Sequence, residues 1–532
     1  MLVSSLPCRF FQFLVARWIR PCCATKRSAL ALRLPNSTEV ACFCRAVLID
    51  VALAAQIHSA LLALGATIAA AVAPLEAKDN YFVNPKSGNR FQIVGVAYQP
   101  GGSAGYKPEQ GRDPLSDGDV CLRDAALMQI LGVNVIRVYN LDPNLNHDLC
   151  ASIFNAAGMY MILDVNSPLV GDSLTSYKPW ESYYAAYLNR TFAVVEAFKS
   201  YPNTLAFFSG NEVLNNVKTG ADVPPYMRAV TRDIKNYVAK HSDRPIPVGY
   251  SAADVRDVLF DSFEYFQCAE DGDASDPSRV DIFALNSYSW CGSSTFQESG
   301  YDKLVEGFSN SSVPIFYSEY GCNTPSPRIF SEVPTIYGPQ MTGVFSGGIV
   351  YEYAQETNNF GLVTINADGS AELLNDFYAL KDQYSKLNFT EIQGSKPPTT
   401  AAPKPPTCSS KLITTKGFAN NFTLPSPPPG AQKIIDNGVS PKPVGKIISV
   451  SSWTVPHTVK NPDGSTLSNL AVKPLADDAT NQPGTNTADG TPTTTATGAT
   501  ASKTNAAGGR PAFVAFPALG LGALAVMAGI AI

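Results

Sequence analysis

Short apolar runs alternate with longer amphipathic stretches between residues 78 and 392. Runs rich in Val, Ile, Leu and Phe are typical of strands buried on both faces of a parallel sheet, and the stretches between them have the pattern of helices. Eight such repeats predict an α/β fold of the (β/α)8 TIM-barrel type. A doubly wound open sheet is the alternative, but the chain has no Gly-rich first turn to support it. The predicted strands are residues 91–99, 133–140, 159–166, 205–212, 246–252, 281–290, 313–321 and 347–354, and the clearest helices are 119–132, 183–201 and 226–241.

Polar side chains stand at the predicted carboxyl ends of these strands, where barrels of this type carry their active sites. Glu212 ends the fourth strand and Glu319 the seventh. Taken alone, the Asn211–Glu212 pair is more typical of a solvated loop or a helix N-cap. Two carboxyl groups at one rim can instead act as acid and nucleophile on a glycosidic bond, with retention of configuration if they lie about 5 Å apart.

Amide and aromatic side chains at the same strand ends suit a sugar. Amides hydrogen-bond ring hydroxyls, and aromatic faces cover the apolar faces of pyranose rings. Asp164 has two interpretations of equal weight, a substrate contact or a structural partner of Arg137. Trp180 and Trp290 are weaker candidates for substrate contact. The candidate binding residues are Gln99, Tyr139, Asp164, Asn211, Tyr288 and Tyr351.

Composition narrows the chemistry further. The 532-residue chain has a net charge of −5 and a pI of about 5.5, with no basic stripe, zinc-finger spacing or P-loop, so we expect no nucleic-acid partner. Its histidines lie far apart in the sequence, which argues against a metal site, and we expect no cofactor and a monomeric protein. The four histidines are His58, His147, His241 and His457.

Both ends carry features of sorting signals. Residues 60–73 form an apolar run ending in small residues, which is typical of a secretory signal with cleavage near Ala77. The basic, Cys-containing stretch before it is unusual, so we expect residues 1–77 to be a signal region with a mis-joined N-terminal extension. Residues 506–532 indicate a GPI-attachment signal with Asn505 as the attachment residue, the alternative being a C-terminal anchor helix. In either case we expect a protein at the outer face of a membrane or in a cell wall.

Cysteines and glycosylation motifs fit the secretory pathway. Six of the eleven cysteines lie beyond the predicted leader, an even number that suggests three disulfides and leaves their connectivity open. Sequons, which mark surface positions in secreted proteins, occur at Asn189, Asn310, Asn388 and Asn421.

The composition changes near residue 393. Residues 393–432 are rich in Pro and Thr and predict a linker, and residues 433–505 predict a low-complexity, O-glycosylated stalk. We therefore expect a barrel domain of residues 78–392 followed by a largely disordered C-terminal region.

A series of motifs makes the interpretation specific. The stretches "YQPGG", "VNVIRVYN", "LDVN", "GNEV", "NSYSWCG", "FYSEYGCN" and "GGIVYEYA" resemble those of the fungal β-1,3-glucanosyltransferases of glycoside hydrolase family 72, the Gas/Gel/Phr type. The resemblance implies a (β/α)8 fold and retaining transglycosylation between β-1,3-glucan donor and acceptor chains, with elongation of cell-wall glucan. Only Cys408 follows the predicted barrel, so the chain resembles the subgroup without a Cys-rich carbohydrate-binding module.

The resemblance also implies roles for single residues. Glu212 would be the general acid/base, Glu319 the nucleophile, and Asn211 the contact to the hydroxyl beside the reacting carbon. Gln99, Tyr139, Asp164, Tyr288 and Tyr351 would line the donor site. The implied disulfides are Cys121–Cys150, Cys291–Cys322 and Cys268–Cys408. A secreted endo-β-1,3-glucanase and a non-catalytic glucan-binding wall protein are the alternatives.

Overall fold

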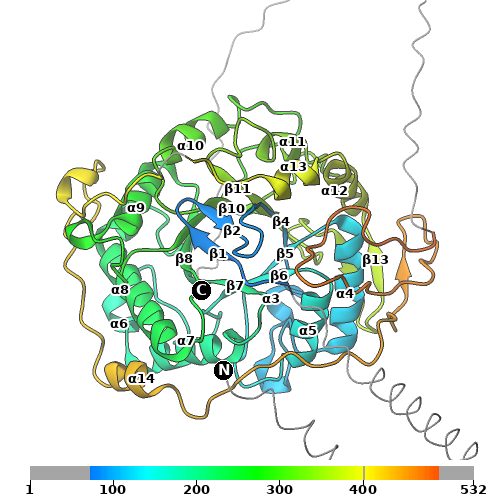
Figure 1. The fold of residues 1–532 in the computed structure, drawn as a ribbon, viewed down its shortest axis with the longest axis horizontal. Coiled ribbons are helices and arrows are strands. Elements are labelled where there is room, and N and C mark those ends of the chain that lie inside the picture. The colour runs from blue at the N-terminus through cyan, green and yellow to red at the C-terminus, as the bar shows by residue number, and fades with distance from the viewer. Residues whose placement is uncertain (1–71, 400–401, 491–532) are drawn as a thin grey trace, which may run out of the picture. The chain divides into compact units, whose positions relative to one another are not determined.

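The computed structural model describes residues 72–399 and 402–490. They contain a closed barrel of eight parallel strands surrounded by helices, which confirms the predicted fold class (Figure 1). Each strand pairs with the next one along the chain, and β11 closes the barrel against β4. All eight overlap the predicted ranges: β4 (Ile93–Ala97), β5 (Val135–Val138), β6 (Tyr160–Asp164), β7 (Thr204–Asn211), β8 (Val248–Ala253), β9 (Ile282–Asn286), β10 (Ile315–Tyr320) and β11 (Phe345–Val350).

A helix follows each barrel strand, and local signals set its ends. In α4 the Asp117 side chain accepts hydrogen bonds from the N–H groups of Asp119 and Val120, at 3.0 and 3.3 Å, and so caps the first turn. Gly132 ends α4 in the left-handed conformation, at φ 87°. The helices after the strands are α4 (Gly118–Leu131), α5 (Asp148–Ala156), α7 (Ala185–Phe198), α8 (Val217–His241), α9 (Arg256–Gln267), α10 (Tyr301–Phe308), α11 (Val333–Ile336) and α12 (Asn375–Ser385). Shorter helices are α3 (Gly102–Gly105), η2 (Pro108–Gln110), α6 (Pro179–Ser182), η3 (Glu270–Gly272), α13 (Phe389–Gly394), η4 (Ser410–Leu412) and α14 (Ala431–Asn437).

The barrel interior changes from apolar to polar along the strands. Alternate residues of a strand face the same side. On β6, Tyr160 and Ile162 belong to a buried apolar cluster, and Asp164 is the next position on that side. On β9, Ala284 belongs to the same cluster and Asn286 follows in the same way. The carboxyl ends of the strands therefore bring polar side chains together above an apolar interior.

A small antiparallel sheet and the residues before it pack against the apolar end of this interior. Phe82 is fully buried in the cluster of the barrel, together with Val72 and Leu75. The sequence predicts a leader up to Ala77 and a domain that begins at residue 78. The folded unit instead includes Val72, because these apolar side chains fill the interior. The sheet consists of β1 (Glu76–Lys78), β2 (Tyr81–Val83) and β3 (Arg90–Phe91).

Residues 402–490, here termed the C-terminal belt, run along the outside of the helices in the same compact unit as the barrel (Figure 1). The disulfide Cys268–Cys408 fastens the start of the belt beside the end of α9. The ring of Phe422 stacks on Tyr265, with centroids 4.4 Å apart. Further along the chain, α14 packs against α7 and α8.

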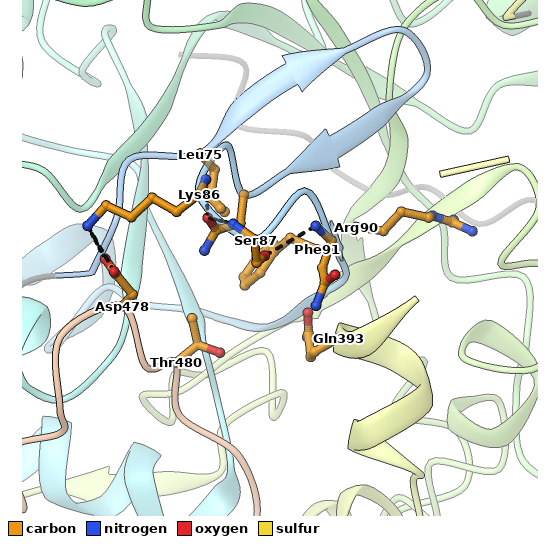
Figure 2. Close-up of a pocket in the computed structure, with 10 residues that line it drawn as sticks. Leu75, Lys86, Ser87, Arg90, Phe91, Gln393, Asp478 and Thr480 are labelled. Atoms are coloured by element: carbon orange, nitrogen blue, oxygen red, sulfur yellow. Dashed lines mark hydrogen bonds and ion pairs between the residues drawn. The ribbon is translucent and has the colours of Figure 1, made fainter. Parts of the chain in front are cut away.

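The second half of the belt continues around the helices. The N–H of Lys446 donates to Asp148 Oδ1 at 2.8 Å. Asn481 Nδ2 donates to the carbonyl of Val133 at 2.8 Å. Near its end, Asp478 pairs with Lys86 at 2.8 Å, in a pocket beside the β2–β3 turn (Figure 2). A short strand, β14 (Val459–Lys460), adds to the pair β12 (Val363–Ile365) and β13 (Ala371–Leu373).

The belt departs from the predicted linker of residues 393–432 and disordered stalk of 433–505. Within the described residues, single apolar side chains, amides and backbone groups of this region contact the barrel domain at irregular intervals along the sequence. Such spacing has no period, so a pattern of hydrophobic positions does not reveal it. The predicted signal before Val72 and the predicted attachment site at Asn505 lie outside the described residues. Across the described ranges, no helix has both the length and the apolar character to cross a bilayer.

The structure contains the three disulfides that the resemblance implies. Cys121–Cys150 joins α4 to α5, Cys291–Cys322 joins the segments after β9 and β10, and Cys268–Cys408 ties the belt to the barrel. All four sequon asparagines are solvent-exposed, as glycosylation requires: Asn189, Asn310, Asn388 and Asn421.

Candidate active site

A pocket of about 460 Å³ opens at the carboxyl ends of the barrel strands. It collects seven of the eight predicted site residues. The eighth, Tyr288, reaches the same place through its hydroxyl, which donates to Glu319 Oε2 at 2.6 Å. The seven lining residues are Gln99, Tyr139, Asp164, Asn211, Glu212, Glu319 and Tyr351.

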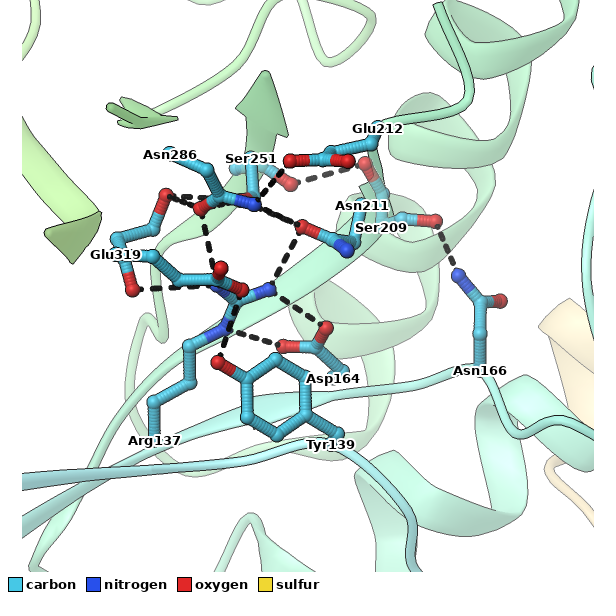
Figure 3. A network of polar contacts seen from close by, with 12 residues as sticks. Arg137, Tyr139, Asp164, Asn166, Ser209, Asn211, Glu212, Ser251, Asn286 and Glu319 are labelled. Carbon is cyan, nitrogen blue, oxygen red and sulfur yellow. Dashed lines mark hydrogen bonds and ion pairs between the residues drawn. The ribbon is translucent and has the colours of Figure 1, made fainter. Parts of the chain in front are cut away.

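Glu319 lies in the buried floor of this pocket. The register of β10 shifts between Tyr317 and Glu319, and such a bulge re-aims a side chain. Oε1 accepts from Arg137 Nη1 at 3.1 Å and from the Tyr139 hydroxyl at 2.9 Å (Figure 3). Oε2 accepts from the Tyr288 hydroxyl. Burial raises the pKa of Glu319 to about 7, opposed by the Arg137 charge and both tyrosine hydroxyls. The three donors therefore favour the ionised carboxylate.

Arg137 is the fully buried centre of the polar network. Its Nη2 donates to Asp164 Oδ2 and to Asn211 Oδ1, both at 3.0 Å, while Nη1 reaches Glu319. Asp164 is thus the ion-pair partner of Arg137, which confirms the structural interpretation, and it also lines the pocket, so substrate contact stays a prediction. Burial raises the pKa of Asp164, and the adjacent guanidinium opposes this rise. One guanidinium therefore sets the positions of three oxygen-bearing side chains.

Glu212 stands on the rim rather than in the floor. It follows β7 in the left-handed conformation, at φ 51°, which costs a non-glycine residue about 1–3 kcal/mol and is typical of functional sites. Its N–H donates to the Ser251 carbonyl at 2.8 Å, and its Oε1 accepts from Asn286 Nδ2 at 2.7 Å. The N-cap of α8 is Asn216, whose side chain accepts from the N–H of Thr219 at 3.0 Å. The N-cap interpretation of Glu212 is therefore wrong.

Asn211 faces the pocket with its oxygen already bonded. Oδ1 accepts from Arg137 Nη2, from Ser251 Oγ at 2.8 Å and from Asn286 Nδ2 at 3.1 Å. Among the described residues, none accepts from its Nδ2. Gln99 is also buried in the pocket wall, and its amide has no hydrogen-bond partner among the described side chains and backbone. Both amides can therefore bond a ligand hydroxyl.

Three tyrosines form one aromatic side of the site. The ring centroid of Tyr351 lies 6.5 Å from that of Tyr139 and 6.2 Å from that of Tyr288, both edge to face. The three rings come from the ends of three different strands. This arrangement suits the apolar face of a ring-shaped substrate.

The sequence profile of the glucanosyltransferase family, glycoside hydrolase family 72, matches residues 64–388. The chain belongs to this family. Aspergillus fumigatus 1,3-beta-glucanosyltransferase gel2 is 52% identical over 436 residues, which cover 82% of this chain and 90% of that protein. The probable 1,3-beta-glucanosyltransferase GAS3 of Saccharomyces cerevisiae is 44% identical over 78% of this chain and 82% of its own. A solved structure of a Saccharomyces cerevisiae Gas2p mutant in complex with laminaritetraose and laminaripentaose is 34% identical, with a TM-score of 0.58 over 67% of this chain and 75% of that one.

Sequence reasoning missed several polar residues of this family 72 site. Asn286 bonds Glu212 and Asn211 with Nδ2, and its Oδ1 accepts from Ser318 Oγ at 2.8 Å. Ser251 and Ser318 share a hydrogen bond of 2.8 Å. Asn286 could have been found, because it opens the motif "NSYSWCG", which also contains Tyr288. The two serines gave no signal, because a hydroxyl within a strand is ordinary.

A second carboxyl pair was also missed as a site feature. Glu352 and Glu356 line the pocket, and Glu352 Oε1 accepts from Asn358 Nδ2 at 3.0 Å. Burial, and after it the charge of the nearby Glu356, raise the pKa of Glu352 and so favour its protonated form. A protonated carboxyl can both donate to and accept from a sugar hydroxyl. Its place near the end of the predicted strand 347–354, next to Tyr351, was the available signal.

The two tryptophan candidates do not line the pocket. Trp290 is buried, and its Nε1 donates to Ser331 Oγ at 2.8 Å, which is a packing role. Trp180 is half-exposed in α6. Within the part of the chain that the structure describes, no group of three or more His, Cys, Asp or Glu side chains is arranged to hold a metal ion.

Proposed function

We propose that this chain is a retaining 1,3-β-glucanosyltransferase, which cleaves β-1,3-glucan internally and transfers the new reducing end to the non-reducing end of another glucan. The names of gel2 and GAS3 and the laminari-oligosaccharides bound to Gas2p support the substrate. The observation that carries the proposal is a pair of unlike carboxyl groups in one pocket. Glu319 is held in the floor by three donors, and Glu212 is held on the rim by one amide.

In the first step, Glu319 attacks the anomeric carbon of the donor sugar while Glu212 gives its proton to the leaving glycosidic oxygen. The bond to the leaving glucan breaks, and a glycosyl ester forms on Glu319. Asn211 Nδ2 holds the hydroxyl beside the reacting carbon. Gln99 and Tyr351 bind the same sugar, and the remaining candidates, Tyr139, Asp164 and Tyr288, fix the nucleophile or its partners.

In the second step, Glu212 takes a proton from a hydroxyl of the acceptor glucan, and that oxygen displaces Glu319 from the anomeric carbon. The same carboxyl therefore serves as acid and then as base. Asn286 connects the two carboxyl groups. Its Nδ2 donates to Glu212, and its Oδ1 lies 3.4 Å from Arg137 Nη1, which in turn donates to Glu319. An endo-β-1,3-glucanase would use the same residues with water as the acceptor.

We also propose that the protein is secreted and held outside the cell by a GPI anchor at Asn505. The three disulfides and four exposed sequons support an oxidising, glycosylating compartment. A phosphatidylinositol-specific phospholipase C should release the full-length protein from membranes. An Asn505→Gln variant that remains equally membrane-bound and lipase-sensitive would reject this attachment residue.

The deciding experiment is product sizing on reduced laminari-oligosaccharides. We expect products longer than the starting sugar with the native protein and none with Glu319→Gln. Products that are only shorter than the substrate would identify a hydrolase instead. Turnover by Glu319→Gln close to the native rate would reject Glu319 as the nucleophile, and a native protein that leaves the sugars unchanged would favour the non-catalytic alternative.

A further inference from the structure

Exposed apolar side chains are concentrated in one segment of the described chain. Of its eight exposed large apolar side chains, five lie between residues 169 and 184, which join β6 to α7. Single exposed apolar residues are normal, whereas a local concentration marks a binding surface. The five are Leu169, Val170, Tyr177, Trp180 and Tyr184. The last three are here termed the aromatic rim.

The segment that carries the aromatic rim also contributes to the wall of the catalytic pocket. Pro168 and Leu174, which belong to the same segment, line the pocket. The ammonium group of Lys218 lies 5.1 Å from the ring centroid of Tyr177, and Lys218 is the second residue of α8, which begins shortly after Glu212. The segment therefore borders the pocket between the loops that follow β6 and β7.

The segment presents these rings from a fixed backbone. Ser167 Oγ donates to Asp172 Oδ2 at 2.7 Å, and Arg190 pairs with the same carboxylate at 2.7 Å. The N–H of Thr175 donates to Ser182 Oγ at 3.0 Å. A surface that is already ordered loses little conformational entropy when it binds. The exposed rings therefore belong to an ordered surface that can bind a ligand at a low entropic cost.

We propose that the aromatic rim binds the glucose units of a β-1,3-glucan chain that extend beyond the pocket. This inference rests on the proposed function and identifies where the rest of a long substrate lies. Glucose rings present apolar faces and hydroxyl edges, which match aromatic rings beside polar groups. Lys178 and Glu181, which lie beside the rings in the sequence, pair with each other at 3.0 Å. Because their charges offset each other, this surface suits an uncharged polymer. Trp180 acts on binding and not on the chemical step.

Binding to chains of different length tests the aromatic rim directly. In the Glu319→Gln background, which prevents turnover, we would titrate laminaribiose, laminaritriose and soluble laminarin by calorimetry. Trp180→Ala and Tyr177→Ala should weaken laminarin binding about fivefold, on the scale of one aromatic contact, and leave the short sugars unchanged. Trp180→Phe should retain most of the affinity. Val444→Ala, an exposed apolar residue of the belt, is the matched control and should change nothing.

The outcomes separate this inference from the proposed function. With Glu319 restored, Trp180→Ala should raise KM for laminarin and leave kcat unchanged. Equal affinity of Trp180→Ala and its parent for laminarin would overturn the inference while leaving the proposed function intact. A change in oligomeric state on size exclusion without a change in laminarin affinity would also overturn it, since the rim would then bind protein. Failure of the native protein to bind or convert any of the sugars would overturn both.

Discussion

The polar network around Arg137 and the C-terminal belt both join residues far apart in the sequence, and they do so differently. In the polar network, Arg137 alone contacts Asp164, Asn211 and Glu319, so one side chain positions three others. In the belt, Phe422 stacks on Tyr265 and, much further along, Asn481 bonds the carbonyl of Val133. No residue is shared between these two belt contacts.

Shared contacts couple residues, whereas separate contacts contribute additively. Substitutions in the polar network around Arg137 should therefore affect one another and change activity strongly. Substitutions in the belt should each cost a portion of stability and leave the chemical step unchanged.

Glu319→Gln and Glu212→Gln should differ in their substrate dependence. Removing the nucleophile should lower kcat by about 10⁴-fold or more on every substrate. Removing the acid should cost much less in the first step with an aryl glycoside, because a good leaving group needs little protonation. Rates on an aryl laminarioside and on an unmodified laminari-oligosaccharide measure the difference. Equal losses by Glu212→Gln on both substrates would argue against its role as the acid.

Asn286→Ala should lower kcat by about 100-fold, because Glu212 loses the amide that holds it and misplacement of a catalytic group is costly. The double variant with Ser318→Ala should lose less than the product of the two single losses, because the side chains share one network. Asn486→Ala is the matched control, a buried belt amide whose Nδ2 donates to the carbonyl of Ala471 at 2.7 Å. Independent effects of Asn286 and Ser318 would contradict the coupling.

Tyr288→Phe should move the acidic limb of the pH profile of kcat/KM upward by about one unit. The Tyr288 hydroxyl donates to Glu319 and stabilises its ionised form, so its removal raises the pKa of the nucleophile. The variant then needs a higher pH to ionise Glu319. Tyr320 is the control, because its hydroxyl bonds that of Tyr384 at 3.0 Å, outside the pocket. Tyr320→Phe should leave the acidic limb of the pH profile in place. A limb that moves downward in Tyr288→Phe would refute the assignment.

The same contrast explains what the sequence could predict. Apolar runs repeat with a period, so the eight strands and the joint position of Glu212 and Glu319 were predictable. Ser318 was not, because its role depends on the register shift in β10. Pro/Thr-rich composition is typical of disorder, and anchors such as Phe422 and Asn481 follow no period. The belt therefore required the structure.

Replacing both Cys268 and Cys408 with Ser should lower the melting temperature by about 5 °C and leave kcat unchanged. The disulfide joins residues 140 positions apart in the sequence. Without it, the unfolded chain gains conformational entropy, which lowers the free energy of unfolding by about 2–5 kcal/mol. Replacing both cysteines avoids a free thiol. Calorimetry and initial rates below the transition measure the two effects. A fall in kcat at low temperature would mean that the belt supports the active site directly.

Two anchors near the end of the belt should differ in the free energy of unfolding. Lys86 and Asp478 are partly exposed, with side-chain exposures of 64% and 32%, so Lys86→Ala should cost less than about 1 kcal/mol. Asn481 is buried, and Asn481→Ala leaves the carbonyl of Val133 without this donor, at a cost of about 1–3 kcal/mol. Denaturant unfolding gives both values, and hydrogen exchange should rise around residues 475–490 in Asn481→Ala alone. Because the two anchors share no partner, their costs should add in the double variant. A double variant that loses clearly more stability than the sum of the single losses would show that the belt is coupled as tightly as the polar network around Arg137.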